Sequence, residues 1–127
     1  MIVFIGSPGS GKSTFWNNHL SSYTRVNNDT LKSRDRCLRV AESALASGQS
    51  CVIDNTNPDN AARKAYIDLA NKYNVPVRAF IFYMPKEVAF HLDTLRMVNK
   101  HRNHLSSRVG SMPIHTFYKK YEKPTVQ

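Results

Sequence analysis

The glycine-rich run at residues 6–13, Gly-Ser-Pro-Gly-Ser-Gly-Lys-Ser, constrains this chain more than any other segment. A short apolar run suited to a buried parallel strand, residues 2–5, precedes it, and the residues after it can open a helix. Glycines let the backbone curl so that successive N–H groups converge on phosphate oxygens, and the helix N-terminus adds the positive end of its dipole. A glycine turn of purely structural origin is the alternative, but the full pattern in this setting predicts nucleoside triphosphate binding.

Individual roles within this segment follow from its chemistry. Lys12 is expected to reach the β- and γ-phosphates, and the Ser13 hydroxyl is expected to hold Mg²⁺. The residues expected to bind the nucleotide are Gly6, Ser7, Pro8, Gly9, Ser10, Gly11, Lys12, Ser13 and Thr14.

Length and cysteine content limit the class of protein. At 127 residues, positions 1–127 are expected to form one domain. Two cysteines without metal-ligand spacing indicate a reducing intracellular compartment, and His101 and His104 lack the further ligands that zinc needs. No apolar run approaches the roughly 18 residues of a membrane span, and the chain opens on a core strand, so neither a membrane span nor a signal peptide is expected.

The charge is strongly positive. Eighteen Lys and Arg face nine Asp and Glu, a net charge of +9. Such a surplus on a small domain indicates a polyanionic partner and favours nucleic acid over a small metabolite. An ATP-binding protein needs positive charge in any case, so charge alone does not decide.

Apolar and turn-forming segments alternate in the order of a parallel α/β sheet with helices on both faces. Asp29 or Thr30 is the expected N-cap of the second helix. Residues 99–111 have little apolar content and are expected to form a short, mobile, basic lid. The expected strands are residues 2–5, 23–27, 50–54 and 76–82, and the expected helices are residues 12–20, 31–47, 60–73, 86–97 and 114–121.

Two aspartates follow expected strands at the edge where ligands of open α/β sheets gather. Asp29 could accept the proton of an attacking hydroxyl in line with the γ-phosphate, or could serve only as a helix cap. Asp54 ends an apolar strand, where a carboxylate can order Mg²⁺, although a loop-capping role is the alternative. Thr56 beside it offers a hydrogen bond to an acceptor, though turn formation would also explain it.

Several arginines are candidates for binding phosphates. Arg96, before the basic lid, could clamp the transferring phosphate or merely close a helix, and Arg102 and Arg108 compete for the same role. Arg36 and Arg63, near the starts of two helices, could neutralise an acceptor's backbone or belong to a solvated face.

The chain resembles the kinase domain of the eukaryotic polynucleotide kinase-phosphatases. The resemblance covers nearly the whole chain, and its most specific part pairs Asn27-Asn28-Asp29-Thr30-Leu31 with Asp54-Asn55-Thr56-Asn57-Pro58-Asp59. The other segments that carry it are residues 6–15, Arg36-Cys37, Arg63 and residues 118–125.

That resemblance implies transfer of the ATP γ-phosphate, with Mg²⁺, to the 5′-hydroxyl of DNA or RNA in strand-break end healing. Asp29 then matches the general base and Arg96 the lid arginine. Asp54 and Thr56 match acceptor-side residues, and Arg36 and Arg63 are candidates for holding the strand's phosphates. It also implies a monomer in the nucleus, joined to a 3′-phosphatase domain that this chain lacks.

The chain departs from the family pattern in three places. Lys32 stands where phage-type relatives have an arginine, and lysine cannot form a bidentate fork with phosphate. No Asp-x-Asp-Gly-Thr phosphatase motif occurs, and the further strand expected after the closing turn is missing, which suggests a domain truncated at its C-terminus. A small-metabolite P-loop kinase and a non-catalytic, nucleotide-dependent binding module remain the alternative functions.

Overall fold

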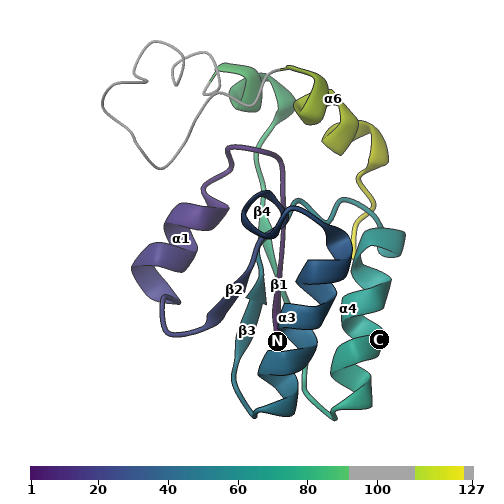
Figure 1. The fold of residues 1–127 in the computed structure, drawn as a ribbon. Helices are drawn as coiled ribbons and strands as arrows, with labels where there is room; N and C mark the ends of the chain where they lie inside the picture. Colours follow the sequence, from purple (N-terminus) through teal and green to yellow (C-terminus); the bar gives the residue numbers. More distant parts are fainter. Residues whose placement is uncertain (92–110, 125–127) are drawn as a thin grey trace.

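The computed structural model describes residues 1–91 and 111–124, whose elements alternate between strand and helix (Figure 1). Residues 86–91 are also helical. The elements are β1 (Ile2–Gly6), α1 (Lys12–His19), β2 (Thr24–Val26), α2 (Asn28–Leu31), α3 (Arg34–Ala46), β3 (Cys51–Ile53), α4 (Asn60–Lys72), β4 (Arg78–Phe82) and α6 (Ser111–Lys120).

The four strands form one parallel sheet in the order β2-β3-β1-β4. In this register Val3 lies opposite Ile53 on one side and opposite Ala79 on the other. Because all strands run in the same direction, the loops that follow β1, β2 and β3 meet at one edge of the sheet. The expected α/β class with a parallel sheet is confirmed.

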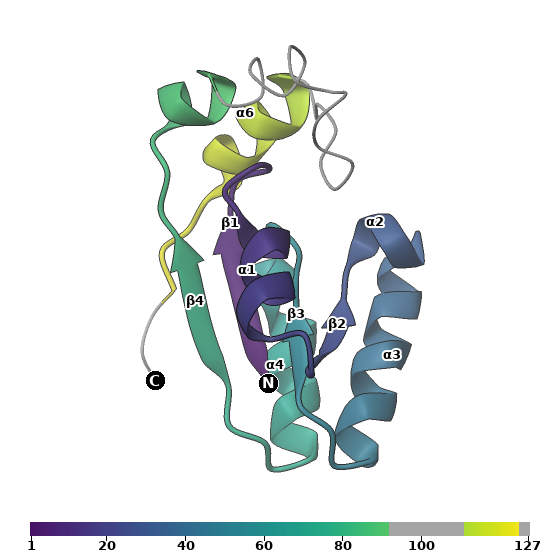
Figure 2. The same cartoon turned by 90° about the vertical axis from the view of Figure 1, so that its left-hand side faces the viewer.

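Helices cover both faces of the sheet, as predicted, and Figure 2 shows α1 on the face opposite α3 and α4. Strand residues alternate between the faces, so Phe4 packs on the α1 side with Phe15, whereas Val3 and Ile5 pack on the other side. On that second side the core includes Cys37 of α3. Two apolar layers thus hold the central strands between the helices.

The expected helix over residues 31–47 is wrong as a single element. It is divided into α2 and α3 at Lys32, whose φ of 74° lies in the left-handed region, and Ser33 caps α3 by accepting a hydrogen bond from the Arg36 backbone N–H. The cap of α2 is Asn27, so neither Asp29 nor Thr30 serves as the N-cap. The short α2 consequently stands on its own at the sheet edge.

The other boundaries moved by a few residues. The last helix begins at Ser111 rather than at residue 114, and β4 begins at Arg78 rather than at residue 76. Residues 92–97 of the fourth expected helix and residues 99–110 of the expected basic lid lie outside the described part of the chain. Among the helices of that part, none combines the length and the apolar character that crossing a membrane requires.

Candidate active site

The glycine-rich loop joins β1 directly to α1, as the sequence predicts. Gly9 and Gly11 have positive φ angles of 81° and 93°, and Gly11 is the N-cap of α1. The buried Lys12 folds back over the loop, where its Nζ donates hydrogen bonds to the carbonyl oxygens of Gly6 at 3.0 Å and Ser7 at 2.7 Å. The loop is therefore closed around its own lysine at the helix N-terminus, the geometry of an anion site.

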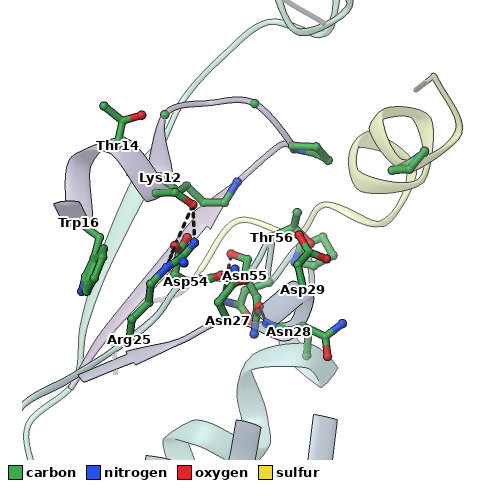
Figure 3. A pocket seen from close by; sticks show the side chains of 18 of the residues that line it. Lys12, Thr14, Trp16, Arg25, Asn27, Asn28, Asp29, Asp54, Asn55 and Thr56 are labelled. Carbon is green, nitrogen blue, oxygen red and sulfur yellow. Dashed lines mark hydrogen bonds and ion pairs between the residues drawn. The ribbon is translucent and has the colours of Figure 1, made fainter. Parts of the chain in front are cut away.

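A cavity of about 710 Å³ opens in front of this loop at the carboxyl ends of the strands (Figure 3). Six of the nine residues expected to bind nucleotide line it, namely Pro8, Gly9, Gly11, Lys12, Ser13 and Thr14. Gly6, Ser7 and Ser10 are not among its lining residues but belong to the loop that forms its wall. The same cavity is lined by Asp29, Asp54 and Thr56, so side chains that are far apart in the sequence share one space.

Asp54 follows β3 and lies at the bottom of this cavity. Its side chain is 1% exposed, and its Oδ2 accepts hydrogen bonds from the Ser13 hydroxyl at 3.0 Å and from Arg25 Nε at 2.8 Å. Its Oδ1 is buried with no hydrogen-bond partner among the described residues. A buried carboxylate oxygen without a donor, next to a serine hydroxyl, is an oxygen pair that suits Mg²⁺.

Ser13 and Asp54 therefore fit the metal that a bound triphosphate would bring. Within the described residues no three His, Cys, Asp or Glu side chains gather closely enough to hold a metal ion by themselves. Phosphate oxygens and water would have to complete the coordination, as is usual for Mg²⁺ at nucleotide sites.

Asp29 lies on α2, exposed to solvent and facing the cavity that the phosphate loop lines. In Figure 3 it stands with Thr56 on the side of the cavity opposite Trp16 and Arg25. As the first-turn acidic residue of α2, it has a favourable place near the positive end of the helix dipole. Two of the three expected catalytic residues, Lys12 and Asp29, thus line a common cavity.

Side-chain amides attach α2 to the end of β3. Asn27 donates from Nδ2 to the carbonyl oxygen of Asp54 at 2.7 Å and accepts from the Thr30 backbone N–H at 3.1 Å. The Asn55 side chain accepts from the Asn28 backbone N–H at 2.7 Å. The carboxylate of Asp29 is therefore carried on a helix that is anchored at its first turn.

Next to Asn55, the side chains of Tyr66 and Cys37 form a buried contact. Desolvation by burial, together with the contact with Cys37, raises the pKa of Tyr66 to about 12. Burial also raises the pKa of the Cys37 thiol. At neutral pH both groups keep their protons and can hydrogen-bond to Asn55.

Arg63 and Arg36 do not join the cavity. Arg63 is 3% exposed, and its guanidinium donates to the carbonyl oxygens of Asn57 and Pro58 at 2.9 Å each and of Glu122 at 2.6 Å. Arg36 is exposed on α3, whereas Arg34 of the same turn lines the cavity. The contacts of Arg63 are those of a residue that joins chain segments, while Arg34 is the arginine at the cavity.

Arg96, Arg102 and Arg108 lie outside the described residues, so the candidates for the lid arginine have no structural account.

Two residues of the site were missed by the sequence predictions. Arg25 lies in β2 beside Val26, and alternation along the strand turns it toward α1 while Val26 enters the core. A charged residue within a short apolar strand was the available signal. Asn27 was also missed, although an asparagine three residues before Thr30 is a typical helix-capping pattern.

A parallel sheet with a glycine-rich loop between β1 and α1, and a carboxylate at the end of the neighbouring strand, defines a P-loop nucleotide-binding domain. A family model described as an AAA domain matches residues 31–112. The chain belongs to this AAA domain family, and it is related to the kinase part of bifunctional polynucleotide phosphatase/kinases. The suspected family is confirmed at that level.

Two relatives carry the sequence similarity. A protein of Acanthamoeba polyphaga mimivirus, assigned as a bifunctional polynucleotide phosphatase/kinase, is 46% identical over 101 residues, which are 77% of this chain and 24% of the viral protein. The bifunctional polynucleotide phosphatase/kinase of Schizosaccharomyces pombe is 33% identical over 129 aligned positions, which cover 100% of this chain and 31% of the yeast protein. The chain thus spans a third or less of these relatives.

Solved structures with the same fold include a gluconokinase from Sinorhizobium meliloti. It superimposes with a TM-score of 0.65 over 97% of this chain and 75% of its own, at 18% sequence identity. At that identity the likeness concerns the fold alone.

Proposed function

We propose that this chain transfers the γ-phosphate of ATP to the 5′-hydroxyl end of a DNA or RNA strand. The observation that carries the proposal is that Asp29, Lys12 and Ser13 line one cavity, in a chain related to the kinase part of polynucleotide phosphatase/kinases. The net charge of +9 supports a polyanionic acceptor.

In this proposal the amides of the phosphate loop and Lys12 hold the β- and γ-phosphates still. Asp29, across the cavity, orients the strand's terminal hydroxyl toward the γ-phosphorus and accepts its proton. Bound Mg²⁺, held by Ser13 and Asp54, would supply charge neutralisation at the phosphate oxygens.

The acceptor strand enters the cavity past Thr56, in the loop that follows β3. The Thr56 backbone carbonyl accepts a hydrogen bond from the Gly6 N–H at 3.2 Å, so this loop is attached to the start of the phosphate loop. Asp54, with its buried carboxylate, is also proposed to contribute to acceptor binding. Arg36 would meet the strand's phosphates farther out on α3, and Arg63 supports the loop from below through its backbone contacts. Arg96 remains the proposed lid arginine.

The larger setting is also part of the proposal. The relatives named above are bifunctional, and this chain spans only their kinase part. We infer that it acts as a monomeric kinase domain with a 3′-phosphatase partner domain, in the healing of broken strands in the nucleus.

The substitution Asp29→Asn tests the chemistry. Removal of a general base should lower kcat for a 5′-hydroxyl oligonucleotide by about 10²- to 10⁴-fold, whereas the affinity for ATP should be unchanged. The matched control is Asp35→Asn, which removes the same charge from an exposed position on α3. Radiolabel transfer and nucleotide titration measure the two quantities.

Acceptor panels distinguish the alternatives. An oligonucleotide with a 5′-hydroxyl should be phosphorylated, and one that already carries a 5′-phosphate should not. The affinity for the oligonucleotide should fall steeply as the salt concentration rises. Transfer to nucleosides or sugar acids with no transfer to oligonucleotides would indicate a small-metabolite kinase. If the wild type phosphorylates no acceptor and Asp29→Asn binds ATP as the wild type does, the chain is a nucleotide-dependent binding module instead. If Asp29→Asn phosphorylates the oligonucleotide as fast as the wild type, Asp29 is not the general base.

A further inference from the structure

The guanidinium of Arg25 contacts both side chains assigned above to the metal. Its Nε donates to Asp54 Oδ2 at 2.8 Å, and its second terminal nitrogen donates to the Ser13 hydroxyl oxygen at 2.7 Å. Ser13 in turn donates to the same Asp54 oxygen at 3.0 Å. The three side chains form a closed triangle of hydrogen bonds at the start of α1. Figure 3 shows Arg25 and Asp54 next to each other there.

This contact is built into the sheet and is not a chance meeting of surface side chains. Arg25 belongs to β2, which pairs with β3, and the Asp54 backbone N–H donates to the Val26 carbonyl oxygen at 2.8 Å. The Trp16 ring of α1 lies beneath the guanidinium, 5.3 Å from its carbon, at a distance suited to a cation–π contact. Strand pairing and an aromatic ring therefore hold the cation over a carboxylate that is only 1% exposed.

A metal ion on the same two side chains would compete with this arginine. Mg²⁺ held by Ser13 Oγ and by Asp54 Oδ1, which is unpartnered in the described part of the chain, would lie directly beside the guanidinium. That guanidinium already occupies Asp54 Oδ2 and one lone pair of the Ser13 hydroxyl. Two cations within a few ångströms of each other also repel, most strongly next to a buried carboxylate. Arg25 itself is 27% exposed and lines the open cavity, so it has room to move away.

We propose that Arg25 is the resident counter-ion of Asp54 in the metal-free protein and is displaced when Mg²⁺ arrives with the nucleotide. Arg25 thereby stabilises the empty site and raises the Mg²⁺ concentration that the loaded site requires. The inference rests on the metal site of the proposed function, but it does not depend on which acceptor the enzyme uses.

The test compares wild type with Arg25→Gln for ADP affinity, measured by calorimetry in EDTA and across a series of Mg²⁺ concentrations. The variant should need at least about fivefold less Mg²⁺ to reach its full ADP affinity, because no arginine must be displaced. Without metal, its thermal unfolding midpoint should be lower than that of the wild type, and saturating Mg²⁺ and ADP should narrow that gap.

Two further variants complete the design. Arg39→Gln removes the same charge from an exposed position of α3 and should match the wild type in both measurements. Arg25→Lys keeps the charge but cannot contact Asp54 and Ser13 at the same time through a planar guanidinium, so its Mg²⁺ requirement should lie between those of the wild type and Arg25→Gln. It also provides the measurement if Arg25→Gln does not fold.

An Mg²⁺ requirement equal to or higher than that of the wild type in both Arg25 variants would overturn the inference and leave the proposed kinase activity untouched. Asp54→Asn tests whether the metal site itself is assigned correctly. If that variant keeps the Mg²⁺ dependence of the wild type, the metal site itself is wrong, and the role of Arg25 falls with it.

Discussion

Gly6 lies where the backbone leaves the sheet to form the phosphate loop, and there is no space for a side chain. A Cβ at this position would lie 2.6 Å from Ser10 Oγ and 2.9 Å from the Cβ of Phe82. Gly48, by contrast, has open space around it and needs glycine only for its φ of 72°. The two glycines are therefore required for different reasons.

Replacing Gly6 with alanine should move the loop away from β4 and distort the phosphate site. We expect a loss of stability of about 1–3 kcal/mol, as for overpacking, together with weaker ADP binding. The control Gly48→Ala should cost about 1–2 kcal/mol through its backbone conformation and leave ADP binding unchanged. Urea unfolding and nucleotide titration give both values. Normal ADP affinity in Gly6→Ala would show that the loop tolerates the added carbon.

Among the elements, α2 depends most on its surroundings. A helix of four residues has almost no stability of its own, because the cost of nucleation is spread over too few hydrogen bonds. The amides of Asn27 and Asn55 attach it to the end of β3, and Tyr66 of α4 lies next to Asn55. The position of Asp29 thus depends on contacts with the end of β3 and, through Asn55, with α4.

The buried Tyr66 predicts a loss of stability in alkali. The unfolded chain loses the phenol proton near pH 10, whereas the folded protein keeps it to a pKa of about 12, so stability should fall as pH rises through this interval. At the alkaline end of this pH interval, this single group should lower the free energy of unfolding by roughly 2–3 kcal/mol.

Thermal or urea unfolding of wild type and Tyr66→Phe between pH 8 and 11, a range of about three units around the free tyrosine pKa, measures this contribution. Phenylalanine cannot ionise, so the variant should lose less stability with rising pH than the wild type. A residual slope is expected from Cys37 and Cys51, whose thiol pKa values burial also raises. Identical slopes would contradict the assignment to Tyr66.

At the scale of the whole molecule, Arg63 joins the segment that follows α6 to the loop below the active site. Its guanidinium donates to three backbone carbonyls from residues 57, 58 and 122, and the Glu122 N–H donates to the Pro58 carbonyl at 2.6 Å. Figure 2 shows α6 lying beyond the carboxyl ends of the strands, above the phosphate loop. The arginine therefore connects the wall of the cavity with the end of the described chain.

Arg63→Met should remove these contacts while keeping most of the apolar stem. Buried carbonyls left without donors should lower the free energy of unfolding by about 2–4 kcal/mol, and the segment around Glu122 should become a site of rapid proteolysis. The neighbouring Lys64→Met is the control, because Lys64 is exposed and forms a surface ion pair with Asp68 one turn away. Unchanged stability and unchanged proteolysis of Arg63→Met would contradict this role.

The local features of this protein were predictable from its sequence. The glycine-rich loop, the apolar strands and the amphipathic faces of α3 and α4 depend on residues that are close to one another in the chain. Their patterns therefore predicted the parallel sheet and the glycine-rich loop between β1 and α1. The placing of Asp29 and Asp54 at one edge also followed, because parallel strands end together.

Tertiary structure decided what depends on contacts between distant segments. The interruption at Lys32 follows from the anchoring of α2 on β3, the contact of Arg25 with Asp54 and Ser13 requires β2 to lie beside β3, and Arg63 turned inward because the chain returns to it at Glu122. No pattern of nearby residues specifies which distant carbonyl or carboxylate a cation will meet. That choice is made only when the strands have taken their order in the sheet.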